Sequence, residues 1–184
     1  DARSSVLDLK DKLKPDMGSL TLSSLNFSNT ESINSPEMIT KLIDKMNKNN
    51  IKPELEVFDN GMINASKYYI KKGLLKPPFY YNIMIGNLYT AQDSLNDISS
   101  MINNLPEKSV FSLGGIGNCQ KRVNYLSVLY ADGVRVGLED FIYEDENRIK
   151  LISNFDLVKR LTDFCNNNNI DILTSKEVRN ILKL

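Results

Sequence analysis

Three charged residues lie close together in a segment that otherwise has the composition of a buried strand. The segment DGVRVGLEDFIY, residues 132–143, contains Arg135, Glu139 and Asp140. Because side chains alternate between the two faces of a strand, Arg135 and Glu139 share one face, and Asp140 begins the turn that follows. The opposite face carries Val134, Val136 and Leu138. One apolar and one ionic face is typical of parallel barrels, where catalysis takes place at the carboxyl ends of the strands.

A second acidic pair lies on an earlier predicted strand. In the segment KPELEVFDNGM, Glu54 and Glu56 point to the same strand face. Together with Glu139 and Asp140 they would place four carboxylates around the guanidinium of Arg135. So many buried carboxylates cannot all stay ionised without more positive charge, which a divalent metal ion or cations from another segment would supply. The alternative is that Glu54 or Asp140 is solvated, or that it only orients Arg135 in a structural ion pair.

Two further segments carry weaker signals for ligand binding. Ser19 and Thr21 share one face of SLTLSSLNF and could donate hydrogen bonds, although hydroxyls in strands are often inert. The glycine-rich segment 114–117 comes just before a predicted helix, whose free backbone amides could meet an anionic or carbonyl oxygen. Glycines before a helix are also ordinary turn chemistry, so this segment alone does not indicate a site.

Composition narrows the classes of function. The chain has 184 residues, enough for one well-buried domain, which we assign to residues 1–184. Its 23 Lys and Arg residues balance 23 Asp and Glu residues, which gives no reason to expect nucleic acid or an anionic membrane as partner. No apolar run approaches the roughly 18 to 20 residues of a membrane span. The absence of histidine excludes a Ser-His-Asp triad, or a histidine-ligated metal site, made by this chain alone.

The cysteines indicate the cellular compartment. Cys119 and Cys165 are far apart and lack the spacing of metal ligands. Such a pair is more typical of two reduced thiols than of a disulfide, and no signal peptide is visible. We therefore expect a cytoplasmic protein.

Strand-like and helical segments alternate along the chain, which predicts βαβ units and a parallel sheet. Residues 4–13 resemble a helix, and Ser35 and Pro36 look like the N-cap and first residue of another. Strands are expected at 17–22, 54–58, 79–85, 109–115 and 133–139, and further helices at 36–50, 62–72, 92–104, 119–130, 154–168 and 175–183. The pattern therefore contains about five β/α units.

About five β/α units cannot close a barrel, which needs eight strands. The chain is either an open doubly wound sheet or the last part of a (β/α)8 TIM barrel. Strands of an open sheet that is buried on both faces are continuously apolar. By contrast, residues 54–59 and 134–140 alternate between ionic and apolar side chains. We therefore predict an α/β fold that comprises about the last five β/α units of a TIM barrel, without its first three strands.

Several motifs resemble those of the β-keto acid cleavage enzymes, whose best-known member is the 3-keto-5-aminohexanoate cleavage enzyme of lysine fermentation. The matching segments are KPDMGSLTLSSLNF, NSPEMI, IKPELEVFDNGMI, GGIGNCQ, GVRVGLEDFIY, SNFDLVKRL and TSKEVRNILKL, in the order expected of that family. The resemblance runs from about Lys14 to Leu184. It implies a zinc-dependent TIM barrel, a homo-oligomer when complete, that exchanges acyl groups between a β-keto acid and acetyl-CoA. The products would be acetoacetate and an acyl-CoA, formed through an enolate and a retro-Claisen step.

The resemblance also implies a role for each candidate residue. Glu139 corresponds to a glutamate ligand of zinc, whose other protein ligands in the family are two histidines of an H-x-H motif on the second strand. Asp140 corresponds to the base that forms the enolate, and Arg135 to the arginine that orients and activates this base. Glu56 resembles an acidic residue that lines the substrate site, and Ser19 resembles a hydroxyl that touches the keto acid.

The sequence departs from the family pattern in several places. The H-x-H strand and a third strand with a Thr-Thr-Gly substrate loop would lie before Asp1. Thr21, also expected at the substrate site, stands where an asparagine is usual, and Asn118 replaces an arginine, which would weaken anion binding. Phe141 replaces an asparagine. These differences leave the identity of the keto acid open but do not alter the three charged residues of segment 132–143.

Two other interpretations were considered. A Schiff-base aldolase barrel would need a lysine on the inner face of a strand near its end, and the predicted strands have none there. A non-enzymatic interpretation is that the chain is a truncated product without catalysis, or a half-barrel that requires a separate amino-terminal chain. Because it lacks histidine ligands, the chain alone is expected to be inactive.

Overall fold

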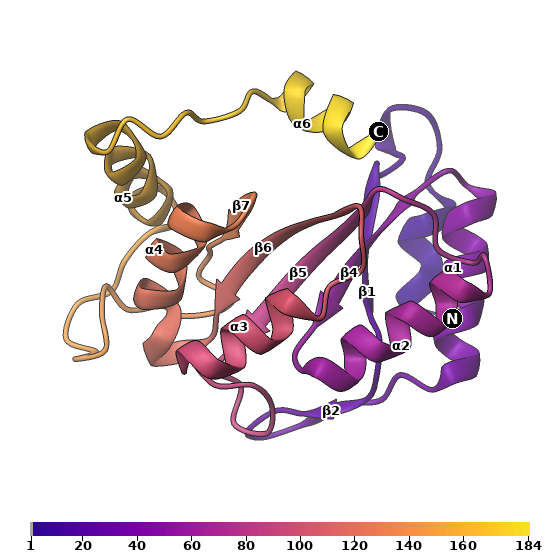
Figure 1. Cartoon of the computed structure of the whole chain (residues 1–184), viewed down its shortest axis with the longest axis horizontal. Coiled ribbons are helices and arrows are strands. Elements are labelled where there is room, and N and C mark those ends of the chain that lie inside the picture. Colours follow the sequence, from indigo (N-terminus) through magenta and orange to yellow (C-terminus); the bar gives the residue numbers. More distant parts are fainter. Residues whose placement is uncertain (1) are drawn as a thin grey trace.

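The computed structural model describes residues 2–184 and is built around one parallel sheet (Figure 1). Five strands lie in the order β1-β4-β5-β6-β7, and every neighbouring pair is parallel. These strands are β1 Met17–Thr21, β4 Lys52–Val57, β5 Phe79–Ile85, β6 Ser109–Gly115 and β7 Gly133–Arg135. A separate antiparallel pair, not predicted from the sequence, joins β2 Leu25–Asn26 to β3 Glu31–Ser32.

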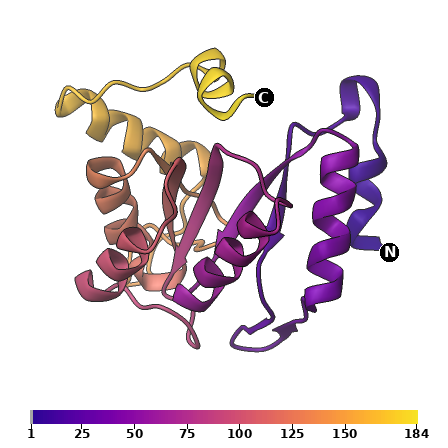
Figure 2. The same cartoon turned by 45° about the vertical axis from the view of Figure 1, so that its right-hand side comes forward.

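In the described residues, four α-helices connect the strands and cover one face of the sheet (Figure 1), and two more follow the last strand. They are α1 Pro36–Lys48, α2 Asn60–Lys71, α3 Leu95–Asn103, α4 Gln120–Tyr130, α5 Asn154–Asn167 and α6 Ser175–Leu182. Strands that are consecutive in a parallel sheet are joined by right-handed crossovers, which place the connecting helices on the same side. Figures 1 and 2 show α1 to α4 along that side and α6 near the start of β1. As predicted, Ser35 caps α1 by accepting a hydrogen bond from the backbone N–H of Met38, and Pro36 is the first helical residue.

The core lies between the sheet and these helices. Leu55 and Val57 of β4 and Ile83 and Ile85 of β5 are buried, and they belong to one cluster with apolar residues of α1 and α2. Burying one such side chain contributes roughly 1.5 to 3 kcal/mol to stability. None of the helices in residues 2–184 is long and apolar enough to cross a membrane.

The opposite face of the sheet is polar. Thr21, Glu56, Asn82 and Ser112 are paired across four neighbouring strands, so they form one row on this face. Glu54 lies one row nearer the amino ends of the strands, because side chains two residues apart point the same way. This is the alternation that the sequence predicted for a barrel interior.

One correction concerns the start of the chain. Residues 4–13 were predicted to form one helix, but the structure has two short 3-10 helices, Ala2–Asp8 and Asp11–Leu13. Asp11 has a φ of 54°, a left-handed conformation that an α-helix cannot accommodate. The apolar pattern there therefore reflects packing of the segment, with Leu7 in the core, and not a continuous helix.

A second correction concerns the last strand. The sequence predicted a strand over 133–139, but β7 ends at Arg135 and a turn covers 138–140. Side chains take the backbone groups that a longer strand would have used: Gln120 donates to the carbonyl of Gly137, and the amide of Leu138 donates to Asn154. The predicted sharing of one strand face by Arg135 and Glu139 is therefore wrong.

Candidate active site

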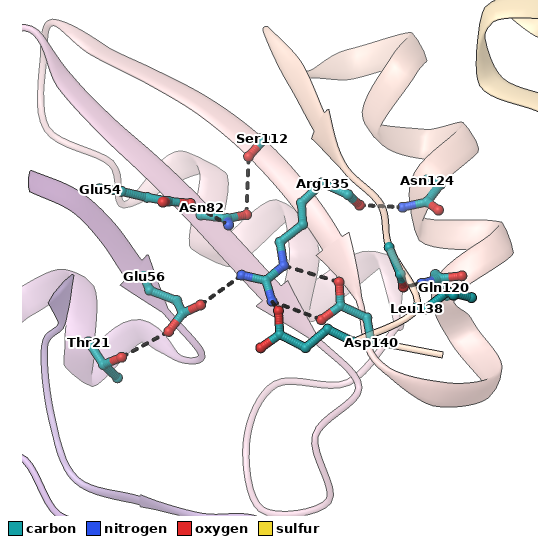
Figure 3. Close-up of polar contacts among 12 residues, drawn as sticks. Thr21, Glu54, Glu56, Asn82, Ser112, Gln120, Asn124, Arg135, Leu138 and Asp140 are labelled. Atoms are coloured by element: carbon teal, nitrogen blue, oxygen red, sulfur yellow. Dashed lines mark hydrogen bonds and ion pairs between the residues drawn. The ribbon is translucent and has the colours of Figure 1, made fainter. Parts of the chain in front are cut away.

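Arg135 is the centre of the polar face (Figure 3). Its Nε and Nη2 donate to the two carboxylate oxygens of Asp140, both at 3.0 Å, and its Nη1 donates to Oε1 of Glu56 at 2.9 Å. The other oxygen of Glu56 accepts a hydrogen bond of 2.8 Å from Thr21. Two-pronged contacts of this kind fix a carboxylate in both position and orientation. The network thus connects β1, β4 and β7 with the turn after β7.

Burial makes these contacts strong. The exposed fraction of the side chain is 5% for Asp140, 16% for Glu56 and 23% for Arg135. Burial alone would lower the pKa of Arg135, but the hydrogen bond and charge of Asp140 and the charges of Glu56 and Glu139 raise it above its usual value. The guanidinium therefore stays charged at any pH at which the protein is folded.

A glycine makes room for the arginine. Gly114 of β6 is paired with Arg135 of β7. A β-carbon at Gly114 would lie 2.8 Å from the sulfur of Met84 and 3.2 Å from the β-carbon of Arg135. The two strands can bring Arg135 to this place only because residue 114 has no side chain.

Polar residues of α4 hold the strand that carries Arg135. Asn124 donates to the backbone carbonyl of Arg135, Gln120 to that of Gly137, and Ser127 to that of Gly133. All three α4 side chains are buried. Sequence reasoning missed them, although their spacing of four and three residues places them on one helix face and so carried a signal.

Glu54 belongs to a neighbouring hydrogen-bond chain. Its Oε1 accepts from Asn82, whose amide oxygen accepts from Ser112, and the Ser112 hydroxyl lies 3.1 Å from that of Tyr80. Tyr80 and Ser112 were not identified from the sequence as polar contacts. Glu54 thus has a neutral partner, and its charge adds to the negative charge of the polar face.

Glu139 is placed differently from the other carboxylates. Its side chain is 86% exposed and contacts only the edge of the network, 3.3 Å from Nη2 of Arg135. The prediction of four carboxylates in a common interior is therefore wrong for Glu139. The turn at 138–140 directs Asp140 inward and leaves its neighbour in solvent.

The described residues do not make a zinc site by themselves. In residues 2–184, no group of three or more His, Cys, Asp or Glu side chains is arranged to hold a metal ion. Glu56 and Asp140 both face the guanidinium of Arg135, which lies between them and disfavours a cation there. Glu139 is the accessible carboxylate beside them and could provide one metal ligand.

The remaining predicted residues lie at or near this network. Thr21 is in it, whereas Ser19 lies one row away, opposite Glu54, and is exposed. Asn118, which was expected from the resemblance to stand in place of an arginine, accepts hydrogen bonds from Nε and Nη2 of Arg148. The sequence analysis missed Arg148, which brings a guanidinium to this position from a later loop.

Glu56 gives the site a defined dependence of stability on pH. Burial raises its pKa from the usual 4.5, against the opposing hydrogen bond of Thr21 and charge of Arg135. The folded protein therefore keeps a proton on Glu56 at pH values where the unfolded chain has lost it. The resulting contribution to stability is complete below the unfolded pKa and is lost as pH rises through the folded pKa.

We expect this contribution to disappear in Glu56→Gln. The free energy of unfolding of the unsubstituted protein minus that of the variant should fall as pH rises above 4.5. Urea unfolding of both proteins between about pH 4 and pH 7 measures this difference. A difference that grows with pH would mean that Glu56 is stabilised as a carboxylate and that our sign is wrong.

The geometry suits proton transfer at the carboxyl ends of the strands. Arg135 occupies one lone pair on each oxygen of Asp140, and a carboxylate has about four such sites. Asp140 can therefore still accept a proton from a bound molecule while its orientation is held. Glu56 is occupied by Arg135 and Thr21 and is less free to do so.

Comparisons with known proteins identify the family to which the chain is similar. A family model described as beta-keto acid cleavage enzyme matches residues 1–184. A 3-keto-5-aminohexanoate cleavage enzyme of Fusobacterium nucleatum is 33% identical over 174 residues, which cover 94% of this chain and 63% of that enzyme. A 3-dehydrocarnitine:acetyl-CoA trimethylamine transferase of Rhizobium meliloti is 31% identical over 172 residues, which cover 92% of this chain and 57% of that protein. The chain thus spans less than two thirds of the length of these curated relatives.

A solved structure supports the fold assignment. A ternary complex of ObcA with C4-CoA adduct and oxalate matches with a TM-score of 0.77 and 16% sequence identity. The match covers 98% of this chain and 48% of ObcA. The prediction of an α/β fold that forms part of a TIM barrel is therefore confirmed.

Proposed function

The chain belongs to the β-keto acid cleavage enzyme family, and from this premise we propose that it carries the acid–base half of an active site for acyl exchange between a β-keto acid and acetyl-CoA. The observation that supports this best is the buried Asp140 carboxylate, held through both oxygens by Arg135 at the carboxyl ends of the strands. Among the relatives, the names of the enzymes from Rhizobium meliloti and Cupriavidus necator include acetyl-CoA. The proposed substrates are therefore a small β-keto acid and acetyl-CoA.

In the proposed reaction Asp140 is the base. It takes the proton from the carbon between the ketone and the carboxylate of the keto acid, while Arg135 keeps it oriented. The enolate carbon then attacks the thioester carbonyl of acetyl-CoA, and the CoA thiolate passes from that carbon to the ketone carbon of the keto acid. The bond between the ketone carbon and the former enolate carbon then breaks in a retro-Claisen step, which releases an acyl-CoA. The former enolate carbon takes back a proton from Asp140, which gives acetoacetate. Glu56, Thr21 and Ser19 line the polar face on which the keto acid would lie.

Glu139 is the one described residue that we propose as a zinc ligand. A catalytic zinc ion usually has three protein ligands, so two would have to come from outside the described residues. When bound, such an ion polarises a carbonyl oxygen. The described residues 2–184 do not supply the other zinc ligands. The steps assigned above to Asp140 and Arg135 use side chains of this chain alone.

The proposal is tested by measuring acetoacetate. The chain is incubated with acetyl-CoA and a panel of β-keto acids, both alone and after co-expression with the part of the Fusobacterium nucleatum relative that the alignment leaves uncovered. We expect acetoacetate in the co-expressed preparation and little from the chain alone. If the two pieces form a stable complex that yields no acetoacetate with any keto acid, the chain is better described as a non-catalytic member of the family.

Zinc binding by this chain alone is expected to be weak. Glu139 is exposed and belongs to no group of three or more ligating side chains in the described residues, so a bound ion would exchange readily with solvent. After dialysis against a chelator, elemental analysis should find far less than one zinc per chain, and the same content in Glu139→Gln. Retention of one zinc per chain would show that this chain holds the metal by itself.

A further inference from the structure

A second pocket lies at the opposite ends of the strands from Arg135. It has a volume of about 510 Å³ and is formed where β1 and β4 begin, close to the end of α6. Figure 1 shows α6 and the C-terminus beside the start of β1. Four lysines line this pocket: Lys14, Lys52, Lys76 and Lys183. We refer to it as the lysine pocket.

The lysine pocket has an excess of positive charge that its own residues do not neutralise. Two negative charges lie among its lining residues: Asp16, which forms an ion pair with Arg179, and the terminal carboxylate of Leu184. Within residues 2–184, none of the four lysines has a carboxylate within ion-pair distance. The chain as a whole has 23 basic and 23 acidic residues, so this excess is local.

Lys52 is held in place inside the lysine pocket. Its Nζ donates a hydrogen bond of 3.1 Å to the backbone carbonyl of Pro78, and the residue is half-buried. Burial lowers the pKa of Lys52, and the charge of Lys183 lowers it further. An ammonium that is partly removed from water and faces a second ammonium is stabilised by any anion that binds between them.

The lysine pocket is separate from the candidate active site. Lys52 and Glu56 are four residues apart on β4, which corresponds to about 13 Å along a strand. In parallel α/β folds the chemistry takes place at the carboxyl ends of the strands, whereas Lys52 is at an amino end. A ligand in the lysine pocket would therefore not be the molecule that reacts near Asp140.

We propose that the lysine pocket binds a small anion that carries a diphosphate group. Each lysine ammonium has three N–H donors, one of which Lys52 uses on the carbonyl of Pro78, and four such groups around one cavity match an anion with several charges. The volume lies within the usual range for small-molecule sites, about 300 to 1,000 Å³. The diphosphate could be free or part of a nucleotide, and the experiment below distinguishes these sources. The proposal does not depend on the function proposed above.

Calorimetric titration of the full chain with inorganic pyrophosphate and with ADP tests this site. We expect saturable binding that weakens as salt is added, because the contacts are ionic. Binding of both ligands with similar affinity would assign recognition to the diphosphate alone, and tighter binding of ADP would assign a nucleotide. No saturable binding of either ligand at millimolar concentration and low salt would overturn the proposal.

Substitutions distinguish binding in the lysine pocket from attraction of the anion to any exposed lysine. Lys52→Gln and Lys183→Gln should each weaken pyrophosphate binding about tenfold, since each removes one close charge from the anion. Lys67→Gln removes the same charge from the exposed surface of α2 and should leave the affinity unchanged. Equal weakening in all three variants would show binding by overall charge and would contradict a defined site. Thermal unfolding of each variant verifies that it is folded.

Discussion

Replacing Asp140 with asparagine is expected to lower acyl-exchange turnover about 10² to 10⁴-fold, the usual contribution of a positioned base. Asparagine has nearly the same shape, and its amide oxygen can still accept one hydrogen bond from Arg135. The variant therefore keeps the geometry of the site but loses the group that takes the proton. Initial rates of acetoacetate formation, measured on the preparation that is active in the co-expression assay, give this ratio.

The matched control for this prediction is Glu139→Gln. Glu139 is next to Asp140 in sequence but is exposed, and we assign it to metal binding and not to proton transfer. In the active preparation, Asp140→Asn should retain its zinc content, whereas Glu139→Gln should lose zinc and activity together. Near-full turnover of the Asp140 variant would refute the role we assign to that residue.

Replacing Arg135 with methionine is expected to reduce the free energy of unfolding by about 3 to 5 kcal/mol, the typical cost of removing one partner from a buried ion pair. Methionine can fill part of the space, but Glu56 and Asp140 would remain buried and close together without a counter-charge. Urea unfolding at neutral pH measures the loss. The loss should shrink in acid, where Glu56 takes up a proton and needs the guanidinium less.

Arg122 provides the comparison that isolates burial. Arg122 also pairs with carboxylates, those of Asp93 and Glu146, but its side chain is 55% exposed. Arg122→Met should therefore cost no more than about 1 kcal/mol, as for other surface pairs. If both arginine variants lose the same small amount, the network around Arg135 is hydrated and our account of its strength is incorrect.

The fold was largely predictable because its signals are local. Strands β5 and β6 were predicted at the residues where they occur, since a short run such as FYYNIMI, rich in aromatic and β-branched residues and bounded by turn signals, is typical of a buried strand. The helix start at Ser35 and Pro36 also depends on neighbouring residues alone. The alternation at Glu54 and Glu56 predicted a polar sheet face, and that face is present.

The arrangement of the site depended on contacts between residues far apart in sequence. Glu56 and Arg135 are separated by 79 residues, and no local pattern states that their side chains meet. Strand periodicity also placed Glu139 beside Arg135 on an inner face, because periodicity assumes that the strand continues. The strand stops at Arg135, since Gln120 and Asn124 of α4 take up backbone carbonyls of residues 135 and 137.

Residue types therefore identified the candidate site residues, and tertiary packing decided which of these side chains contact one another. Arg135, Asp140 and Glu56 were recognisable because charged side chains rarely occur in strands unless they are paired. Whether each of them is buried or exposed follows from the turn after β7 and from the helix packed against it. That is why Asp140, 5% exposed, and Glu139, 86% exposed, have opposite environments although they are adjacent in the chain.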